Sequence, residues 1–394
     1  MIIISARIIL GVFFGLALIY WLGQLLLIIR VIRAVPVMEK LNPREPAKWP
    51  MVSVVIPARN EEKTIREAVA TRLEDDYPEL EMILIDDRST DQTGEIVDEF
   101  ARRDPRVKPV HIKDLPPDWL GKQFAMNEGV KAATGEWLLF SDADIHVRRG
   151  TVRKAVAYAE ERKLDHLPIF PDIYPAGFLL DILNTIFIRQ ISLAARIWAV
   201  ENPRSKAAIG SGSFNLVRRT ALERSRGFEW IRMESADDAA LGKALKECGA
   251  RESLVNGRGY VSVHFYASLR AMMVGADRPT YTTIGNFSFW RLFVMGLIFL
   301  LLELSPYLAL LPLGLRGLGF LGAAMALISY MLNILTNLWF RRPVWTSFFT
   351  WLGAFFVTFE MWHAGFVGAI RKGVYWRGTF YPNEVLKKGK RFSF

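Results

Sequence analysis

The stretch WLLFSDAD at residues 137–144 joins four apolar residues to an acid-x-acid triplet. Such a short apolar run, followed by polar residues, predicts a buried strand over Trp137–Phe140. Just past a strand, residues two apart can point the same way, so Asp142 and Asp144 can present two carboxylates on one side. These oxygen ligands suit Mg²⁺ or Mn²⁺, which bind one or two carboxylates together with substrate phosphates. The alternative interpretation of the triplet is a solvated turn.

The same alternation of short apolar runs and helical segments extends around this stretch. Further strands are predicted at Met51–Ile56, Met82–Ile85 and Val107–His111. Helices are predicted over residues 61–73, 94–102 and 123–132, with Asn60 capping the first helix and Pro57 ending the first strand. This rhythm predicts an α/β domain over residues 50–266, with a mostly parallel sheet that binds ligands at the carboxyl ends of its strands. No glycine-rich phosphate loop follows the first strand, so an ordinary dinucleotide-binding fold is not expected.

Two acidic pairs occupy positions where carboxylates can take part in chemistry. Asp86 and Asp87 follow the second predicted strand, where they can accept hydrogen bonds from a ribose or a base N–H. Asp237 and Asp238 open a predicted helix, whose dipole helps to keep a carboxylate ionised. An ionised Asp beside an alcohol is a candidate general base. A capped turn and an ordinary acidic helix N-terminus are the alternative interpretations of the two pairs.

The composition predicts one soluble domain attached to membrane segments. Of the 394 residues, 51% are hydrophobic and 23% are charged, which excludes both a disordered chain and an all-membrane bundle. Ile8–Ile29 carries no charge and is long enough to span a bilayer, so residues 1–34 are predicted to form an anchor. The basic residues that follow this stretch are Arg30, Arg33, Lys40, Arg44 and Lys48. By the positive-inside rule they place the next domain in the cytoplasm.

The C-terminal third predicts further segments of a multi-pass protein of the cell membrane. Apolar stretches occupy Leu292–Leu313, Gly317–Leu338 and Val344–Ile370, within a hydrophobic region of residues 291–370. The tail, residues 371–394, is basic. Three full crossings would place this tail outside, against the positive-inside rule. We therefore expect a cytoplasmic tail and one re-entrant or interfacial stretch.

Charged residues within apolar segments modify this picture. Residues 177–200 are mostly apolar but include charged side chains, which predicts an amphipathic helix at the membrane surface. Residues 267–290 are expected to form an interfacial connector. Glu303, Glu360 and His363 lie inside the C-terminal stretches, where ionisable groups are either functional or paired with a neighbouring helix. The net charge of +10, combined with membrane segments, favours lipid headgroups or phosphorylated substrates as partners over nucleic acid.

Taken together, the motifs resemble family 2 glycosyltransferases with the GT-A fold. In chain order they are IPARNE at 56–61, DDRSTD at 86–91, GKQFAMN at 121–127, DAD at 142–144, residues 210–219 with Gly227-Phe228, and DDAAL at 237–241. The resemblance covers roughly residues 51–266 and rests on the order and spacing of these motifs. The membrane segments and YWRGTFY at 375–381 resemble the branch that includes hopene-associated, ceramide and carotenoid-acid glycosyltransferases.

The resemblance implies a role for each matching position. Asp238 would be the catalytic base that activates the acceptor hydroxyl, and Asp144, with Asp142, would hold a divalent cation. The nucleotide-sugar would be bound by Pro57, Ala58, Arg59, Glu61, Asp86, Asp87, Lys122, Asp142 and Asp237. One base opposite a leaving diphosphate implies inversion at the anomeric carbon, since no second carboxylate suggests itself as a nucleophile.

One departure from the family narrows the expected reaction. The Gln-x-x-Arg-Trp motif of processive polysaccharide synthases is missing after Asp238, which favours the transfer of a single sugar. Arg270 and Arg278 can contact either the diphosphate or lipid headgroups. Trp376 and Arg377 can close over the site, or form an interfacial aromatic with a snorkelling arginine.

The sequence therefore predicts an inverting, hexosyltransferase-type enzyme at the cytoplasmic face of the membrane. It would move one sugar from a nucleotide-sugar, with UDP as the expected nucleotide, to a lipid hydroxyl. A polyprenyl-phosphate acceptor is the alternative within the same class. A catalytically silent membrane protein, which binds nucleotide-sugar or scaffolds partners, is the alternative from another class.

Overall fold

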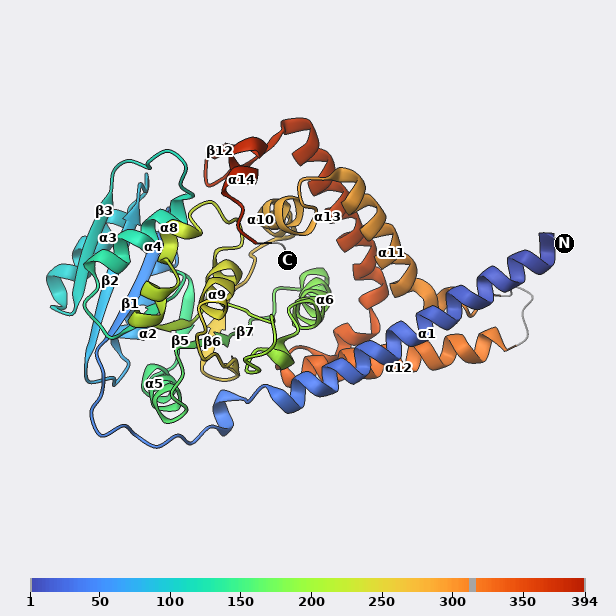
Figure 1. Cartoon of the computed structure of the whole chain (residues 1–394), viewed down its shortest axis with the longest axis horizontal. Coiled ribbons are helices and arrows are strands. Elements are labelled where there is room, and N and C mark those ends of the chain that lie inside the picture. The colour runs from blue at the N-terminus through green and yellow to red at the C-terminus, as the bar shows by residue number, and fades with distance from the viewer. Residues whose placement is uncertain (1, 312–316, 393–394) are drawn as a thin grey trace. The chain divides into compact units, whose positions relative to one another are not determined.

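The computed structural model describes residues 2–311 and 317–392, and the chain divides into two compact units. The sheet unit consists of Val35–Tyr174, Arg196–Phe265 and Pro382–Phe394. The helical unit consists of Met1–Ala34, Pro175–Ala195 and Tyr266–Tyr381. Each unit is thus assembled from segments that are far apart in the sequence (Figure 1).

The sheet unit is built around a mixed sheet with the strand order β3-β2-β1-β4-β8-β6-β9. Its strands are β1 (Val52–Ala58), β2 (Leu80–Asp87), β3 (Val107–Ile112), β4 (Trp137–Phe140), β6 (His166–Phe170), β8 (Asn215–Arg218) and β9 (Val255–Asn256). Only β8 runs against its neighbours in this sheet, pairing antiparallel with both β4 and β6. The predicted α/β class with a mostly parallel sheet is confirmed. A smaller sheet has the order β5-β10-β7, from β5 (Ile145–Val147), β10 (Val261–Val263) and β7 (Asp172–Ile173).

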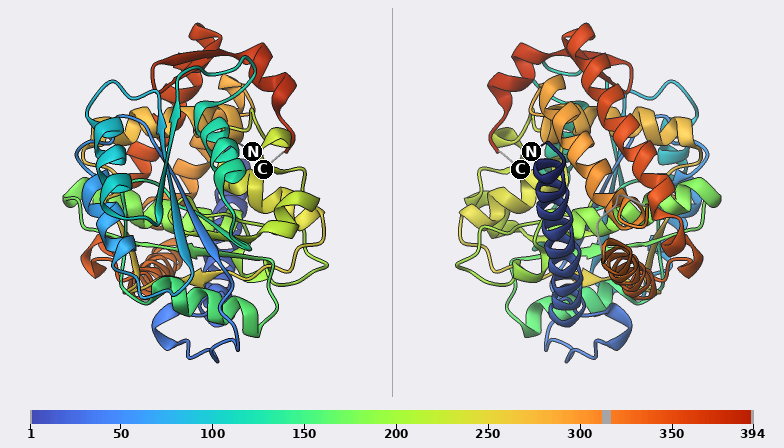
Figure 2. Two further views of the ribbon diagram at one scale, coloured as in Figure 1. Left: turned by 90° about the vertical axis from the view of Figure 1, so that its left-hand side faces the viewer. Right: turned by 90° about the vertical axis from the view of Figure 1, so that its right-hand side faces the viewer.

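Helices cover both faces of the main sheet. The helices of the sheet unit are α2 (Ile65–Leu73), α3 (Thr93–Arg103), α4 (Gly121–Ala132), α5 (Thr151–Glu161), α7 (Arg219–Arg224), α8 (Gly227–Trp230), α9 (Asp237–Glu247) and α14 (Asn383–Gly389). Figure 2 (left) shows the sheet edge-on, with α2 and α3 on one side and α4 on the other. The close packing of α4 needs a glycine, because a Cβ on Gly129 would lie 2.4 Å from a methyl group of Val55.

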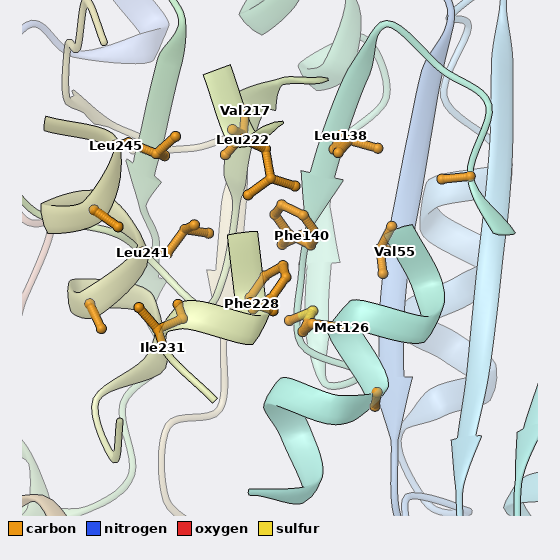
Figure 3. Packing of buried hydrophobic residues seen from close by; sticks show 14 of the residues in the cluster. Val55, Met126, Leu138, Phe140, Val217, Leu222, Phe228, Ile231, Leu241 and Leu245 are labelled. Carbon is orange, nitrogen blue, oxygen red and sulfur yellow. The ribbon is translucent and has the colours of Figure 1, made fainter. Parts of the chain in front are cut away.

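A hydrophobic core links this sheet to α4, α8 and α9. Phe140 of β4 and Phe228 of α8 meet edge-to-face, with ring centroids 5.0 Å apart (Figure 3). Leu241 and Leu245 of α9 lie in the same cluster. Phe392, close to the C-terminus, also belongs to it. The core therefore fixes the start of α9, which carries Asp237 and Asp238, relative to the end of β4.

The structure corrects three local predictions. β1 continues through Pro57 to Ala58, so Pro57 does not end the strand. The helix predicted from residue 61 begins only at Ile65, and Asn60 does not cap it. Asn60 instead adopts a positive φ of 55°, and its side-chain oxygen accepts a hydrogen bond from the backbone N–H of Thr90 at 2.8 Å. This contact links the turns that follow β1 and β2.

The helical unit contains most of the apolar sequence. Its elements are α1 (Ile2–Ala34), α6 (Phe178–Ala194), α10 (Leu269–Pro279), α11 (Phe289–Leu308), α12 (Leu318–Trp339), α13 (Thr350–Arg371), β11 (Gly373–Trp376) and β12 (Thr379–Pro382). Within the described residues, five helices are long and apolar enough to cross a membrane by length and composition: α1, α6 extended to Ala199, α11, α12 and α13. The end of the predicted stretch Leu292–Leu313 lies partly outside the described residues.

Three ionic contacts join charged residues of this unit, whereas Glu360 on α13 has no ion-pair partner among the described residues and one of its carboxylate oxygens is buried without a hydrogen bond. The guanidinium of Arg189 on α6 contacts Glu303 on α11 at 2.7 Å, and Arg342 contacts Asp181 of α6 at 2.6 Å. His363 on α13 lies 3.0 Å from Asp277 on α10. Pairing lowers the cost of burying these groups. The predicted position of residues 177–200 at the membrane surface stays a prediction.

Candidate active site

The candidate site lies where β1, β2 and β4 end in the sheet unit. These strands are parallel, so their carboxyl ends meet at the same edge of the sheet. Lys122, in the first turn of α4, joins the segments that follow them. Its Nζ lies 2.7 Å from Asp142, just past β4, and 2.9 Å from Asp237, at the start of α9. One ammonium group therefore connects two acidic motifs that are far apart in sequence.

Asp238 is oriented by backbone N–H groups beside this ammonium. Its Oδ2 accepts a hydrogen bond from the N–H of Gly212 at 3.2 Å, and its Oδ1 accepts one from Ala239 at 2.8 Å. The approach depends on glycine, because a Cβ on Gly210 would lie 2.0 Å from the carbonyl oxygen of Asp238. Burial, reinforced by the neighbouring charge of Asp237, raises the pKa of Asp238 to about 6. A carboxylate with this pKa can take up a proton near neutral pH.

Asp144 lies among other carboxylates. Burial, and then the negative charges of Asp142 and Glu61, raise the pKa of Asp144 to about 6. Among the residues that the structure describes, no basic side chain comes within 4.0 Å of Asp144 to form an ion pair. Excess negative charge of this kind favours the binding of a cation.

These carboxylates fit a divalent cation only as a partial ligand set. No group of three or more His, Cys, Asp or Glu side chains within residues 2–311 and 317–392 is arranged to hold a metal ion. Asp142 and Asp144 nevertheless offer two carboxylates with hard oxygen donors. Mg²⁺ commonly takes one or two carboxylates when substrate phosphates complete its coordination. The donor set therefore fits an ion that binds together with a phosphorylated ligand.

Lys122 is held in its charged form by its surroundings. Burial alone would lower the pKa of its ammonium group, but Asp142, Asp237 and Asp238 outweigh this effect and raise it. Gly212 faces the same contact, since a Cβ there would lie 2.6 Å from Asp142 and 3.6 Å from the Lys122 ammonium. The packing therefore requires glycine at Gly210, which meets the backbone of Asp238, whereas a Cβ on Gly212 would meet only the end of the Asp142 side chain.

Arg72 on α2 is a component of the site that the sequence interpretation missed. Its guanidinium is buried and donates hydrogen bonds to the Ser141 hydroxyl at 2.7 Å and to the Asp142 carbonyl at 2.9 Å. Burial lowers its pKa to about 10, although Asp144 and Asp142 favour the charged form. The signal was present, because Arg72 continues the buried stripe of Ile65, Ala68 and Val69 at helical spacing.

The two residues of the Asp86-Asp87 pair point to opposite faces of β2. Asp87 is buried, accepts two hydrogen bonds from its neighbour Arg88 at 2.7 and 3.1 Å, and faces Gly121 at the start of α4. Asp86 instead accepts a hydrogen bond from the N–H of Ser89 at 3.1 Å and lies 3.3 Å from His111. The structure therefore brings Asp87 next to the segment that carries Lys122, and directs Asp86 toward β3.

The remaining predicted residues of the sheet unit lie at the end of β1. Pro57 and Ala58 are the last residues of the strand, and Arg59 follows it, partly buried. Glu61 is fixed by its backbone N–H, which donates to Thr93 at 2.8 Å, and by the Thr64 hydroxyl at 3.0 Å from its carboxylate. Its charge acts on Asp144.

The other predicted contacts belong to the helical unit. The guanidinium of Arg278 lies over the ring of Trp376, 3.6 Å from its centroid, and that of Arg377 lies 5.9 Å from the same centroid. Arg270 is exposed on α10. Three of the four predicted residues are thus brought together, through a cation–π contact that the sequence interpretation did not predict.

Known proteins share this domain and its fold. Residues 53–226 match the family described as Glycosyl transferase family 2. The chain is 33% identical over 116 residues to an uncharacterised glycosyltransferase of Bacillus subtilis (strain 168), covering 29% of this chain and 32% of that protein. It is 25% identical over 236 residues to the 4,4'-diaponeurosporenoate glycosyltransferase of Staphylococcus haemolyticus (strain JCSC1435), covering 59% and 61%. The chain thus spans less than two thirds of the length of these relatives.

A solved structure extends the likeness to nearly the whole chain. It is a mannosyltransferase from Pyrobaculum calidifontis in complex with GDP-Man and Mn²⁺, with a TM-score of 0.54 and 19% sequence identity. The alignment covers 93% of this chain and 99% of that one. At this identity the likeness concerns the fold, and it confirms the predicted GT-A architecture.

Replacing Arg72 tests whether its buried guanidinium supports the acidic cluster. Arg72→Met removes the donors to Ser141 and Asp142 and should lower the free energy of unfolding by about 2–4 kcal/mol. Arg66→Met is the matched control on the same helix, because its side chain is 52% exposed and pairs with Glu99 at the surface. The control should cost less than about 1 kcal/mol. Thermal unfolding of the purified protein measures both, and equal losses would contradict the assigned role.

Proposed function

We infer from the family 2 glycosyltransferase domain formed by residues 53–226 that this chain transfers one sugar from a nucleotide-sugar to the hydroxyl group of a membrane lipid. The observation that carries the proposal is the cluster around Lys122, where Asp142, Asp237 and Asp238 meet beside Asp144. The apolar helices of the helical unit supply the second requirement, which is access to an insoluble acceptor.

In the proposed reaction, Asp238 acts as the general base. Its carboxylate takes the proton from the acceptor hydroxyl as the acceptor oxygen bonds to the anomeric carbon. The bond from that carbon to the diphosphate breaks on the opposite side, so the configuration inverts. The backbone N–H groups of Gly212 and Ala239 orient the carboxylate for this step. The raised pKa makes Asp238 a stronger base than an exposed Asp.

The nucleotide-sugar would lie along the carboxyl ends of β1, β2 and β4. Pro57, Ala58, Arg59, Glu61 and Asp87 would line the nucleoside, with Asp86 the weaker candidate because it faces β3. Lys122, now paired with Asp142 and Asp237, would turn to the diphosphate and stabilise its negative charge as the sugar leaves. A divalent cation held by Asp142 and Asp144 would supply further neutralisation of that charge.

A lipid acceptor is supported by both the chain and one relative. The 4,4'-diaponeurosporenoate glycosyltransferase takes its name from a carotenoid acid, and it aligns with 59% of this chain. In the helical unit, Arg278, Trp376 and Arg377 form a basic and aromatic group that suits a membrane interface. We propose that these residues contact the acceptor or lipid headgroups.

Asp238→Asn tests the proposed base and distinguishes the acceptors. With a hydroxyl acceptor, turnover should fall by about 10²–10⁴-fold, because Asn cannot take up the proton. Donor binding should remain. A polyprenyl phosphate needs little help from a base, so unchanged turnover would favour that acceptor. The assay follows sugar incorporation into membrane lipids by mass spectrometry, with UDP- and GDP-sugars compared in parallel.

Glu247→Gln serves as the control, because this exposed carboxylate lies at the far end of the same helix. Purified wild-type protein that neither hydrolyses nucleotide-sugar nor modifies any lipid class would favour the silent scaffold.

The pH dependence of the reaction provides a separate test. A base is active when deprotonated, so kcat/KM should fall as the pH drops below about 6, the pKa of Asp238. Asp237 is the charge that raises this pKa after burial, so Asp237→Asn should move the acidic limb to lower pH. The exposed Asp114→Asn should leave the limb in place. If Asp237→Asn leaves the pH at which kcat/KM falls unchanged, the assignment of Asp238 as the base is contradicted.

The assembly of the sheet unit supports a proposal for the membrane topology. β6 precedes α6 and β8 follows it, yet the two strands pair directly, so both ends of α6 would lie on one side of a membrane. The tail returns to the same unit, because the N–H groups of Arg391 and Phe392 donate to Glu234. We therefore propose that α6 makes no single crossing and that α11, α12 and α13 together cross an even number of times. This supports the expected cytoplasmic tail and interfacial helix.

Labelling of single cysteines tests this topology. In a Cys248→Ser background, Arg102→Cys and Lys388→Cys should react with a membrane-impermeant maleimide only in inverted vesicles. Arg7→Cys, exposed near the start of α1 and just before the apolar stretch Ile8–Ile29, should react in intact cells. If Lys388→Cys reacts on the side opposite to Arg102→Cys, the proposal that the tail and the sheet unit lie on the same side of the membrane is wrong.

A further inference from the structure

A basic groove lies on the sheet unit, away from the acidic cluster. It has a volume of about 260 Å³ and is formed between residues 42–49 and the start of α5. Its charged and aromatic lining residues are Glu45, Trp49, Arg148, Arg149, Arg153, Lys154 and Tyr260. The short strand β5 separates it from the site described above, because Asp144 precedes this strand and Arg148 follows it.

Positive charge in the groove is largely uncompensated. Glu45 is the only carboxylate among its lining residues, and it is taken up by Arg153 at 2.9 Å. Among the described residues, Arg148, Arg149 and Lys154 have no carboxylate within ion-pair distance. Arg148 and Arg149 are exposed. A concave surface with clustered, unpaired cations attracts anions.

Two aromatic rings hold the cations in place. Arg148 and Lys154 lie over the ring of Tyr260, 5.2 and 4.8 Å from its centroid, and the Lys154 ammonium also donates to the Tyr260 hydroxyl at 3.2 Å. Arg153 lies 4.9 Å from the centroid of Trp49. These contacts order the long side chains before a ligand binds, which lowers the entropic cost of binding.

The groove is tied by the chain to the candidate anchor. Its first lining residue, Asn42, is eight residues beyond Ala34, the last residue of α1. Even fully extended, that connection spans at most about 29 Å. Arg44 and Lys48 add exposed positive charge along the same segment. Basic residues directly after a membrane helix attract anionic lipid headgroups.

We propose that this groove binds the phosphate of an anionic phospholipid from the membrane that α1 enters. The arginines and Lys154 would contact the phosphate oxygens, while Trp49 and Tyr260 would place amphipathic rings beside the headgroup. Binding would hold the sheet unit to the lipid surface through a contact separate from α1. Soluble phosphate offers the same chemistry and is the alternative source. The proposal does not depend on sugar transfer.

The test measures headgroup preference by native mass spectrometry of the full-length protein in detergent. Phosphatidylglycerol and phosphatidylcholine are added in equal amounts, and the ratio of the two bound lipids is read out. Lipids that bind unspecifically to the apolar helices contribute equally to both. The double variant Arg148→Gln/Arg149→Gln should lower the ratio of bound phosphatidylglycerol to bound phosphatidylcholine, after the unspecific part is subtracted, by about 25-fold. Each arginine near an anionic lipid contributes about fivefold to this decrease.

Arg102→Gln/Arg103→Gln is the matched control, because it removes two adjacent exposed arginines from the end of α3. The control should keep the wild-type ratio, and millimolar inorganic phosphate should not change it. An unchanged ratio in the groove variant, or an equal loss in both variants, would overturn the proposal. Displacement of phosphatidylglycerol by inorganic phosphate would identify a soluble-phosphate site and also overturn it.

Sugar transfer by the groove variant in detergent separates the two proposals. The substituted arginines are outside the acidic cluster, so turnover should match that of the wild type. Absence of transfer in the wild type would count against the proposed function and leave the lipid ratio interpretable.

Discussion

The site depends on the ion pairs of the largely buried Lys122 side chain, which is 20% exposed. A buried charge is costly unless opposite charges are held close to it. Asp142 and Asp237 provide them at 2.7 and 2.9 Å, and so tie the end of β4 to the start of α9. Gly210 allows the chain between them to approach, and Arg72 secures the backbone of Asp142 from the other side. Loss of either carboxylate would leave the Lys122 ammonium with one close counter-charge instead of two.

The sheet unit imposes a second constraint, because it is made of three separate chain segments. Under the proposed topology, each helical segment between them leaves and returns on the same side of a membrane. Sequence hydropathy considers each helix alone. It therefore predicted three crossings, which place the basic tail outside, whereas the positive-inside rule places the tail in the cytoplasm. The pairing of β6 with β8 and the place of Phe392 in the core support the proposed side of the tail, since they connect positions that hydropathy treats independently.

The sequence pattern correctly predicted elements whose conformation depends on neighbouring residues in the chain. Trp137–Phe140 is found as predicted, and the helix at Asp237 begins where the acidic pair indicated. Asn60 was misread because its side chain binds the turn after β2, a partner 30 residues away. Nothing in the sequence near Phe392 indicates that it belongs to the core of α8 and α9. Arg72 could have been found, since an arginine within an apolar helical stripe must have a buried partner.

The balance of charge in the cluster explains why its parts would act together. Glu61, Asp142, Asp144, Asp237 and Asp238 face the cations Lys122 and Arg72, so negative groups are in excess. Burial, and then this excess, raises the pKa of both Asp144 and Asp238 to about 6. A diphosphate that approached these groups alone would be repelled. Under the proposed function, added positive charge near Asp144 would therefore favour the binding of a nucleotide-sugar and would also free Lys122 to face the diphosphate. Under the proposed function, the acidic excess thus couples donor binding to cation binding and keeps Asp238 basic.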